Sequence, residues 1–273
     1  MLRRTFLGSA ASMLGLRGES APNTLTPAER KAGWRLLFDG STFEGWDNPA
    51  RRNPPAHSWT IADGCLHAVA RPDIREDLLT IEKFDNFEVA FEWRVAPGGN
   101  SGFKYLIQDR VMIDYGLKPK DVGKFEDHLR WEMINRRSDR SRLRGQGEEY
   151  SVGFEYQVID DAGHQDARRG PKYQAGALYS LVGASKPAAR PPGQFNAARI
   201  VKKGLHVEHW LNGVKVVDTS LQSPAIRESL EARWTNSHPV YELLTRLPFK
   251  AAPLCLQNHN DEAWFRNIRI RPR

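Results

Sequence analysis

The sequence predicts an all-β protein, in which antiparallel sheets pack as a β-sandwich and the helices are peripheral. Short segments of alternating apolar and polar residues recur throughout residues 34–270, and turn residues separate them. The pairs Asp63-Gly64 and Asn212-Gly213 each join two such segments, as tight β-hairpins require. Many short strands with regular turns and few helices indicate a sandwich.

Two short helices are expected, each marked by a capping residue that proline follows. Thr26 is the N-cap of the first, with Pro27 at the first helical position and Glu29 at the third, where a capping box places it. Ser223 caps the second helix, which reaches Trp234. Both helices lie outside the strand pattern, so we expect them at the periphery.

The strands are assigned from the alternating segments in chain order. The pattern is clearest at residues 86–95, where every odd-numbered residue from Phe87 to Val95 is apolar, so that one face of the strand is buried. The segments interpreted as strands, including the two arms of each hairpin, are 33–40, 43–46, 58–69, 86–95, 100–107, 153–161, 175–182, 195–201, 205–211, 214–218, 253–259 and 263–271.

Residues 109–150 interrupt this pattern, because they are highly charged and alternate poorly. The composition of residues 121–137 is compatible with a helix. We interpret the segment as a partly helical insertion, arm or lid, since loops of this length in a compact domain are often functional.

The basic charge balance could suggest a nucleic-acid partner or an anionic surface. Lys and Arg number 40 and Asp and Glu 33, a net charge of +7. Part of the excess lies near the N-terminus, and part lies in the arginines between residues 136 and 144. The chain contains no RNA- or DNA-binding motif, so we expect a solvated basic surface.

The N-terminus has the order of residues of an export signal. Arg3-Arg4 precedes Phe6 and Leu7 and then a short apolar run, as in twin-arginine signals. That run is too short for a permanent membrane span. We therefore expect residues 1–21 to be a signal, residues 22–273 to form one domain, and the protein to be periplasmic.

The two cysteines, Cys65 and Cys255, both lie in apolar strand-like segments. Export would permit a disulfide between them. A core of this size does not need a cross-link, so we expect two separately buried thiols.

The segment Gly153–Asp161 is the strongest candidate for a site strand. Phe154 and its apolar neighbours at positions 156 and 158 alternate with Glu155 and Gln157, so one face packs while a carboxylate and an amide face a ligand. By the same alternation, we expect Asn100 and Lys104 to share one concave surface with Glu92.

Several motifs together resemble the 3-keto-disaccharide hydrolase family. In order they are G-W-R-L-L-F-D-G, G-N-S-G-F-K-Y, G-F-E-Y-Q-V-I-D-D, G-A-L-Y, V-E-H-W-L-N-G, and L-Q-N-H with F-R-N-I-R-I-R, within residues 33–271. The resemblance implies a concanavalin-like jelly roll. It also implies cleavage of 3-keto-glucosides, as a lyase and hydratase whose net result is hydrolysis, with a divalent metal ion in some members.

The chain departs from the family pattern in three places. Phe195-Asn196 replaces Trp-Asn, and Asn258 stands where the family has an aspartate in L-Q-D-H-G. Residues 109–150 also exceed the usual spacing between motifs. Because hard cations favour anionic oxygen ligands, Asn258 weakens the case for a metal ion.

In the implied reaction, the ketone acidifies the proton at C2, the enolate expels the oxygen at C1, and water adds to the product. Glu155 is the candidate base or metal ligand, although it could merely balance the charge of Lys104. Gln157 would orient a hydroxyl group. Lys104 would stabilise the enolate, or it could be a cross-strand partner of Glu92.

Other candidates complete the predicted site. His259, in the L-Q-N-H motif, could exchange a proton near neutral pH. Tyr179, in G-A-L-Y, is a candidate substrate-binding residue. Arg266 falls in an apolar row, so we expect it to pair with a site carboxylate or a substrate oxygen. His206 and His209 point to opposite faces of one strand and do not form a metal pair.

Two alternative functions remain open. Glu155, Gln157 and Asp160 have a spacing similar to that of jelly-roll glucanases, but Glu155 and Asp160 fall on opposite faces unless a bulge intervenes. A carbohydrate-binding module without catalysis is the other. For that function the stacking surfaces would come from the tryptophans at positions 46, 59, 131 and 210.

Overall fold

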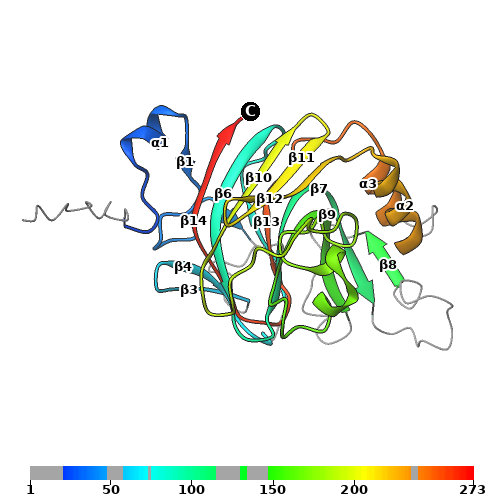
Figure 1. Ribbon diagram of the computed structural model, residues 1–273, viewed down its shortest axis with the longest axis horizontal. Helices are drawn as coiled ribbons and strands as arrows, with labels where there is room; N and C mark the ends of the chain where they lie inside the picture. Colours follow the sequence, from blue (N-terminus) through cyan, green and yellow to red (C-terminus); the bar gives the residue numbers. More distant parts are fainter. Residues whose placement is uncertain (1–20, 48–57, 73–74, 115–129, 134–146, 235–238) are drawn as a thin grey trace, which may run out of the picture.

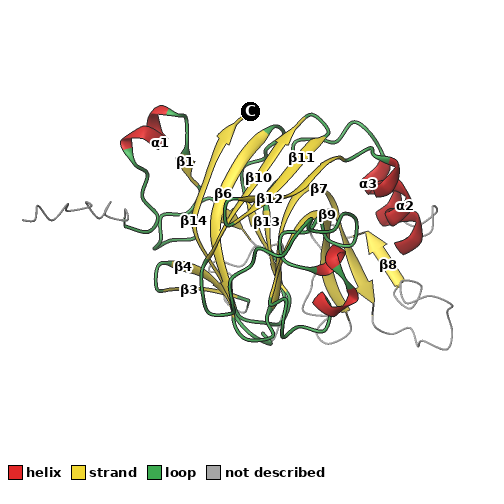
Figure 2. Ribbon diagram, in the orientation of Figure 1, coloured by secondary structure: helices red, strands yellow, loops and turns green. Residues whose placement is uncertain are grey.

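The computed structural model is a jelly-roll β-sandwich of two antiparallel sheets, which confirms the predicted fold class (Figures 1 and 2). It describes residues 21–47, 58–72, 75–114, 130–133, 147–234 and 239–273. Residues 1–20 of the predicted export signal, which spans residues 1–21, lie outside the described part. Among the described helices, none is both long and apolar enough to cross a membrane.

The larger sheet is built mainly from the C-terminal half of the chain and a central strand, β6. Its order is β12 (Val214–Ser220), β11 (His206–Leu211), β10 (Asn196–Lys203), β6 (Phe87–Val95), β14 (Ala263–Pro272), β4 (Cys65–Ala68) and β3 (Trp59–Ala62), while β1 (Arg35–Leu36) also pairs with β14.

The smaller sheet carries the predicted site strand. Its order is β2 (Trp46–Asp47), β5 (Leu78–Thr80), β13 (Cys255–Asn258), β7 (Asn100–Asp114) and β8 (Arg130–Met133), and β9 (Gly147–Ile159) pairs along β7. The expected alternation on β9 is present, since Phe154, Tyr156 and Val158 are fully buried in the core. Their neighbours on the strand must therefore face away from the larger sheet.

One hydrophobic core joins the two sheets. Phe91 of β6 stacks on Phe103 of β7, with 4.2 Å between ring centroids, and meets Tyr156 edge-on at 5.7 Å. Phe265 of β14 adds a third ring at 6.4 Å. These contacts come from both sheets, so Phe91 lies where the layers are held together.

Both predicted hairpins are confirmed. Asp63 and Gly64 have φ angles of 51° and 68°, and Asn212 and Gly213 have 49° and 81°. Two consecutive positive φ values match the twist of the flanking strands, which explains the Asp-Gly and Asn-Gly pairs.

The two predicted helices are present. Helix α1 (Pro27–Lys31) has the complete capping box, because the backbone N–H of Glu29 donates to Thr26 Oγ1 and the backbone N–H of Thr26 donates to the Glu29 carboxylate. Helix α2 (Pro224–Arg233) follows Ser223, whose side chain makes no capping hydrogen bond.

The sequence prediction missed a further helix, α3 (Pro239–Thr245). It has only seven residues and lacks a recognisable periodic face, and contacts with α2, β7 and β9 support it (Figure 1). Two short 3-10 turns, η4 (Ala167–Arg169) and η5 (Pro171–Tyr173), lie in the loop after β9.

The prediction of a strand at residues 175–182 was wrong, because this segment forms turns and isolated bridges. The segment lies along the edge of β9, where Tyr179 N–H donates to Glu155 O and Gln157 N–H donates to Ala177 O. It then curls, because the N–H groups of residues 181 and 182 both donate to Leu178 O. Local turns therefore replace a continuous ladder despite the apolar composition.

The proposed insertion is partly β-structure. Strand β7 continues to Asp114, β9 begins at Gly147, and residues 130–133 form β8, so the helix expected over 121–137 is wrong at those four residues. Residues 115–129 and 134–146 lie outside the described part. The pairing of β7 with β9 continues past a register shift between Tyr105 and Asp109. Hydrogen bonds between these two distant segments therefore make the region β-structure, although its sequence alternates poorly.

The cysteine prediction is confirmed. Cys65 and Cys255 are buried free thiols, and they lie on different sheets. Burial raises the pKa of both thiols, so neither is activated as a nucleophile.

Replacing Phe91 with alanine should lower the free energy of unfolding by about 3–5 kcal/mol, because a large ring between two sheets would leave a cavity. Urea denaturation monitored by fluorescence measures this. Ile81, which is 67% exposed, provides the control, and Ile81→Ala should change stability by no more than about 0.5 kcal/mol. Similar losses in both variants would contradict the placement of Phe91 in the core.

Candidate functional site

A polar row crosses four adjacent strands on the outward face of the smaller sheet. Lys104 on β7 lies opposite Glu155 on β9 and opposite Cys255 on β13. Cys255 in turn pairs with Leu79 on β5, and Asp77 lies two residues before Leu79. Because side chains two residues apart share a face, Asp77 belongs to the same row. The structure therefore brings a buried ammonium group and two carboxylates together.

Glu155 is buried although it points away from the core, with only 7% of its surface exposed. Burial raises its pKa to about 7, while the charges of Lys104 and Arg233 oppose that rise. Its side chain lies flat across Gly102, where a Cβ atom would come within 2.2 Å of Glu155 Oε1. The absence of a side chain at position 102 thus makes room for the carboxylate.

Lys104 is 1% exposed and its ammonium group lies 3.5 Å from Asp77 Oδ2. Asp77 also accepts hydrogen bonds from the thiol of Cys255 at 3.5 Å and from the backbone N–H of Asn258 at 3.3 Å. Asp77 was not predicted as a site residue, because it follows Arg75-Glu76 in a charged run. Its position two residues before the apolar Leu79 was the available signal.

Side chains from outside the sheet cover Glu155. The hydroxyl of Tyr179 donates to Asp166 Oδ2 at 3.1 Å, and the guanidinium carbon of Arg233 lies 5.0 Å from the centroid of the Tyr179 ring. Arg233 ends helix α2 and also donates to Ser180 Oγ at 2.6 Å. Burial raises the pKa of Tyr179, so its phenol stays protonated near neutral pH. Asp166 and Arg233 were not predicted.

Two amides on this face carry buried oxygens without a hydrogen-bond partner among the described residues. They are Gln157 Oε1 and Asn100 Oδ1. The Gln157 amide nitrogen donates weakly to Tyr173 O at 3.5 Å, which orients the group. Because unsatisfied buried acceptors are costly, such atoms are typical of a surface built for a polar ligand.

A second polar group, the imidazole cluster, consists of His164, His259 and Asp261. One possible ligand atom from each lies within 4.8 Å of the others. Asp261 Oδ2 accepts the backbone N–H of Asn100 at 3.1 Å, which ties the cluster to β7. Burial lowers the pKa of His259 to about 4, so its ring is neutral near pH 7. His164 and Asp261 were missed because they occur in loops without periodic patterns.

Two predicted site residues, Glu92 and Arg266, lie elsewhere, and this placement was wrong. They face each other on β6 and β14 of the larger sheet, where Arg266 Nε donates to Glu92 Oε2 at 2.8 Å. The chain passes from one sheet to the other between β6 and β7, so alternation along the sequence does not carry across that turn. Lys104 is therefore not a partner of Glu92.

Arg266 is not part of an apolar row, because β14 contains a bulge. The register shifts between Arg266 and Arg269, and Asn267 has a φ of 53°. Ile268 and Ile270 consequently face the core. Arg266 is half-buried on the outward face, and its guanidinium carbon lies 3.8 Å from the centroid of the Phe195 ring. Arg266 does pair with a carboxylate, but that carboxylate is Glu92 on the larger sheet rather than a residue of the candidate site.

The two alternative functions depended on Asp160 and on the tryptophans, and most of those residues that the structure describes are engaged within the protein. Asp160 accepts the backbone N–H groups of Gly98 at 2.8 Å and Ala162 at 3.0 Å, so it holds a turn. Of the tryptophans, Trp46 and Trp59 are buried, Trp210 lies beneath the guanidinium of Arg199, and the side chain of Trp131 is outside the described part.

His206 and His209 point to opposite faces, as predicted. His209 is buried between Tyr105 Oη at 3.0 Å and Gly176 O at 2.9 Å, whereas His206 is exposed beside Asp218. His209 thus has a structural place in the core.

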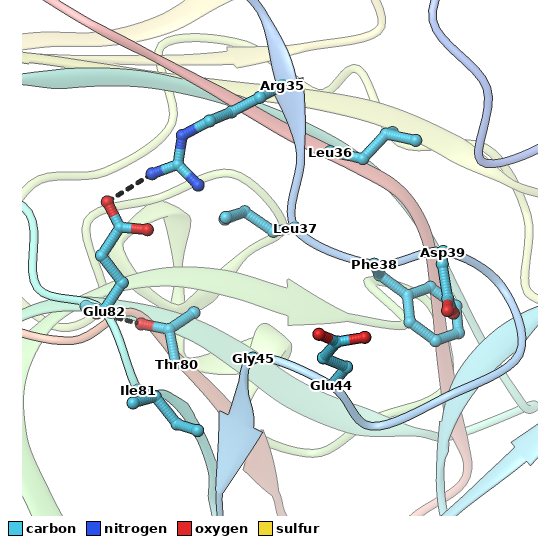
Figure 3. Close-up of a pocket in the computed structure, with 10 residues that line it drawn as sticks. All are labelled: Arg35, Leu36, Leu37, Phe38, Asp39, Glu44, Gly45, Thr80, Ile81 and Glu82. Atoms are coloured by element: carbon cyan, nitrogen blue, oxygen red, sulfur yellow. Dashed lines mark hydrogen bonds and ion pairs between the residues drawn. The ribbon is translucent and has the colours of Figure 1, made fainter.

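A cavity of about 460 Å³ lies apart from the polar row (Figure 3). Leu37, Phe38 and Thr80 contribute to its wall, and an ion pair between Arg35 and Glu82 stands at one side. Its lining comes from β1, from residues between β1 and β2, and from residues 80–82 at the end of β5, as the side chains in Figure 3 show. It includes none of the predicted site residues.

The chain matches a known protein family over most of its length. A family profile described as the 3-keto-alpha-glucoside-1,2-lyase-like domain matches residues 33–271. A curated protein of Bacteroides thetaiotaomicron named 3-keto-disaccharide hydrolase is 30% identical over 255 residues, which cover 88% of this chain and 78% of the relative.

Solved structures share the fold. Two candidate glycosyl hydrolases from Parabacteroides distasonis superpose with TM-scores of 0.65 and 0.53. Their identities to this chain are 23% and 25%. The matches cover 93% and 88% of this chain, and 100% and 99% of the respective relatives.

Replacing Glu155 with glutamine should stabilise the protein above neutral pH and have little effect near pH 4. The folded protein releases the Glu155 proton near pH 7, whereas the unfolded chain releases it near 4.5. Between these values the folded state binds more protons, so the wild type loses stability as pH rises. The glutamine variant avoids this loss of roughly 3 kcal/mol.

Urea denaturation at about pH 4 and about pH 8 measures the difference. The matched change Glu92→Gln alters a half-exposed ion pair and should give no such gain. Equal pH dependence in the two variants would show that Glu155 is not held in a desolvated environment.

Proposed function

Because the chain belongs to the 3-keto-alpha-glucoside-1,2-lyase-like family, we propose that it cleaves 3-keto-glucosides by elimination followed by hydration. The family and the named relative support cleavage of a glycosidic bond. The finer reaction rests on one observation, the burial of Glu155 beside Lys104 on the outward face of the smaller sheet.

Glu155 would remove the proton at C2, which the C3 ketone makes acidic. With a pKa of about 7, its carboxylate is substantially ionised at neutral pH and is a stronger base than an ordinary glutamate. The electron pair moves toward the ketone oxygen, where the Lys104 ammonium group would stabilise the enolate. The Gln157 oxygen, which has no hydrogen-bond partner within the described part of the chain, would accept a hydrogen bond from a sugar hydroxyl.

The enolate then re-forms the ketone and expels the oxygen at C1, which takes up the proton that Glu155 has removed, and a double bond is left between C1 and C2. Water adds across that bond, with hydroxyl at C1 and a proton returned to C2. The sum consumes one water and breaks one glycosidic bond. Tyr179 stays protonated and borders this region, so it would bind a polar group of the sugar.

Direct hydrolysis by two carboxylates receives less support. Asp160 is engaged by two backbone N–H groups, and it follows Glu155 at a spacing that places it on the opposite side of the strand. A retaining pair needs carboxyl groups about 5–5.5 Å apart. A purely sugar-binding function is also less supported, because the buried charges of Lys104 and Glu155 exceed what binding a neutral sugar requires.

Purified protein should cleave a 3-keto-glucoside and leave the unoxidised glucoside intact, as followed by chromatography of the released sugar. Glu155→Gln should reduce the rate by about 10²–10⁴-fold, because the general base is lost. Glu92→Gln, the same chemical change on the other sheet, should keep the wild-type rate. Cleavage of the unoxidised glucoside alone would refute the elimination mechanism.

We further propose that the imidazole cluster holds a divalent metal ion. Two imidazoles and a carboxylate form a donor set that suits transition-metal ions, and the neutral ring of His259 offers a lone pair. His164 Nδ1 accepts the backbone N–H of Asp166 at 3.0 Å, so this ring must release that bond to become a ligand through that nitrogen. A bound cation would supply a Lewis acid for a sugar oxygen.

The family departure at Asn258 does not disturb this cluster. The Asn258 amide donates to Ser58 O at 2.8 Å and Val69 O at 3.0 Å, and its oxygen accepts the N–H of Asn260 at 2.9 Å. A carboxylate could not donate to two carbonyls, so asparagine suits this loop. Its replacement of aspartate therefore concerns loop structure more than metal binding.

Calorimetric titration of chelator-treated protein with Mn²⁺ or Zn²⁺ should detect binding, and His259→Ala should weaken it by more than about tenfold. His206→Ala is the control. His206, Glu208 and Asp218 also lie close together, but Lys215 already contacts both carboxylates, Glu208 at 3.3 Å and Asp218. No binding by the wild type, or equal loss in both variants, would exclude a metal site at His259.

A further inference from the structure

Lys104 lies between two carboxylates on the outward face of the smaller sheet. Glu155 is on one side, on the neighbouring strand β9. Asp77 is on the other side, just before β5, and Lys104 reaches it across β13 at 3.5 Å. Since neighbouring strands are only about 4.8 Å apart, the ammonium group acts on both carboxylates. Its position between them decides how strongly it acts on Glu155.

Asp77 has a fixed position. It is 6% exposed, and it accepts the backbone N–H of Asn258 at 3.3 Å and the Cys255 thiol at 3.5 Å. A backbone donor does not rotate away, and the short aspartate side chain has few rotamers. Asp77 therefore presents a carboxylate at a defined point, to which the flexible lysine is attracted.

The charged and titratable groups around Glu155 come from four directions. Lys104 on β7 and Arg233 at the end of α2 lower its pKa, while Asp77 before β5 and Asp166 in the loop after β9 raise it. Tyr179 borders the same space from residues 175–182 and also senses the charge of Glu155. Burial is the largest influence on the Glu155 pKa, and Lys104 is the largest opposing one.

We propose that Asp77 is a positioning residue that draws the Lys104 ammonium group toward itself and thereby keeps Glu155 a strong base. This role rests on the proposed function of Glu155 as the base that removes the C2 proton. Without the Asp77 charge, the ammonium group would associate with Glu155, the better ion pair would favour the carboxylate, and proton abstraction would be weaker.

The first measurement needs no substrate. Protein labelled with ¹³C at the glutamate side-chain carboxyl groups is titrated by NMR, and Glu155→Gln assigns the Glu155 signal. We expect the Glu155 midpoint near pH 7 in the wild type. In Asp77→Asn it should fall by about one pH unit or more. Cys255→Ser keeps the Asp77 charge and should leave the midpoint unchanged.

The second measurement uses Lys104→Met, because removing one member of a buried ion pair can destabilise the fold while removing both is better tolerated. If Asp77 acts through Lys104, adding Asp77→Asn to this background should shift the Glu155 midpoint less than Asp77→Asn does alone. If Asp77→Asn does not fold, the double variant must titrate close to Lys104→Met. A Glu155 midpoint in the double variant that is lower than in Lys104→Met by one pH unit or more would overturn the role of Asp77.

The pH dependence of kcat/KM separates this role from a structural one. With a 3-keto-glucoside as substrate, the acid limb of Asp77→Asn should move to lower pH together with the NMR midpoint, while kcat at high pH falls. An unmoved midpoint and acid limb would overturn the role of Asp77 even in an active enzyme. A shifted midpoint in a protein that cleaves no 3-keto-glucoside would instead refute the proposed function and leave the electrostatic coupling established.

Discussion

The pairing of β7 with β9 sets the register in which Lys104 lies opposite Glu155, and the candidate site depends on that register. A shift of one residue would turn the carboxylate into the core and the aromatic side chains outward. The core prevents such a shift, because Phe103, Tyr105, Phe154 and Tyr156 are all fully buried on the other face. Apolar packing on one side of the sheet therefore positions the charges on the other.

Burying these charges works against stability. A carboxylate and an ammonium group lose hydration beneath the loop after β9 and helix α2, and their mutual attraction offsets only part of that cost. The pKa of Glu155 records the remainder, since burial still raises it to about 7. The same environment that makes Glu155 costly to ionise would make it an effective base, so stability and activity are opposed at this residue.

Residues of the site come from parts of the chain that are far apart in sequence. Asp77 precedes β5, Lys104 lies on β7, and Arg233 ends α2, and all three influence Glu155. The imidazole cluster joins the loop after β9 to the turn after β13. This convergence follows from the strand order β5-β13-β7, with β9 along β7, in which chain neighbours are rarely sheet neighbours.

Local patterns therefore determined much of the fold. Alternation gave most strands and the inward and outward faces of β9, the Asp-Gly and Asn-Gly pairs gave two hairpins, and capping residues gave α1 and α2, because each signal acts between residues close in sequence. Family motifs pointed to Glu155, Lys104, Gln157 and His259. Tertiary structure alone decided which sheet each strand joins. It separated Glu92 and Arg266 from the site, turned residues 175–182 into a curled segment, and added Asp77, Arg233, His164 and Asp261. Neither the pairing between distant segments nor the bulge in β14 leaves a periodic pattern in the local sequence. The sequence alone therefore could not show which strands pair or where β14 shifts register.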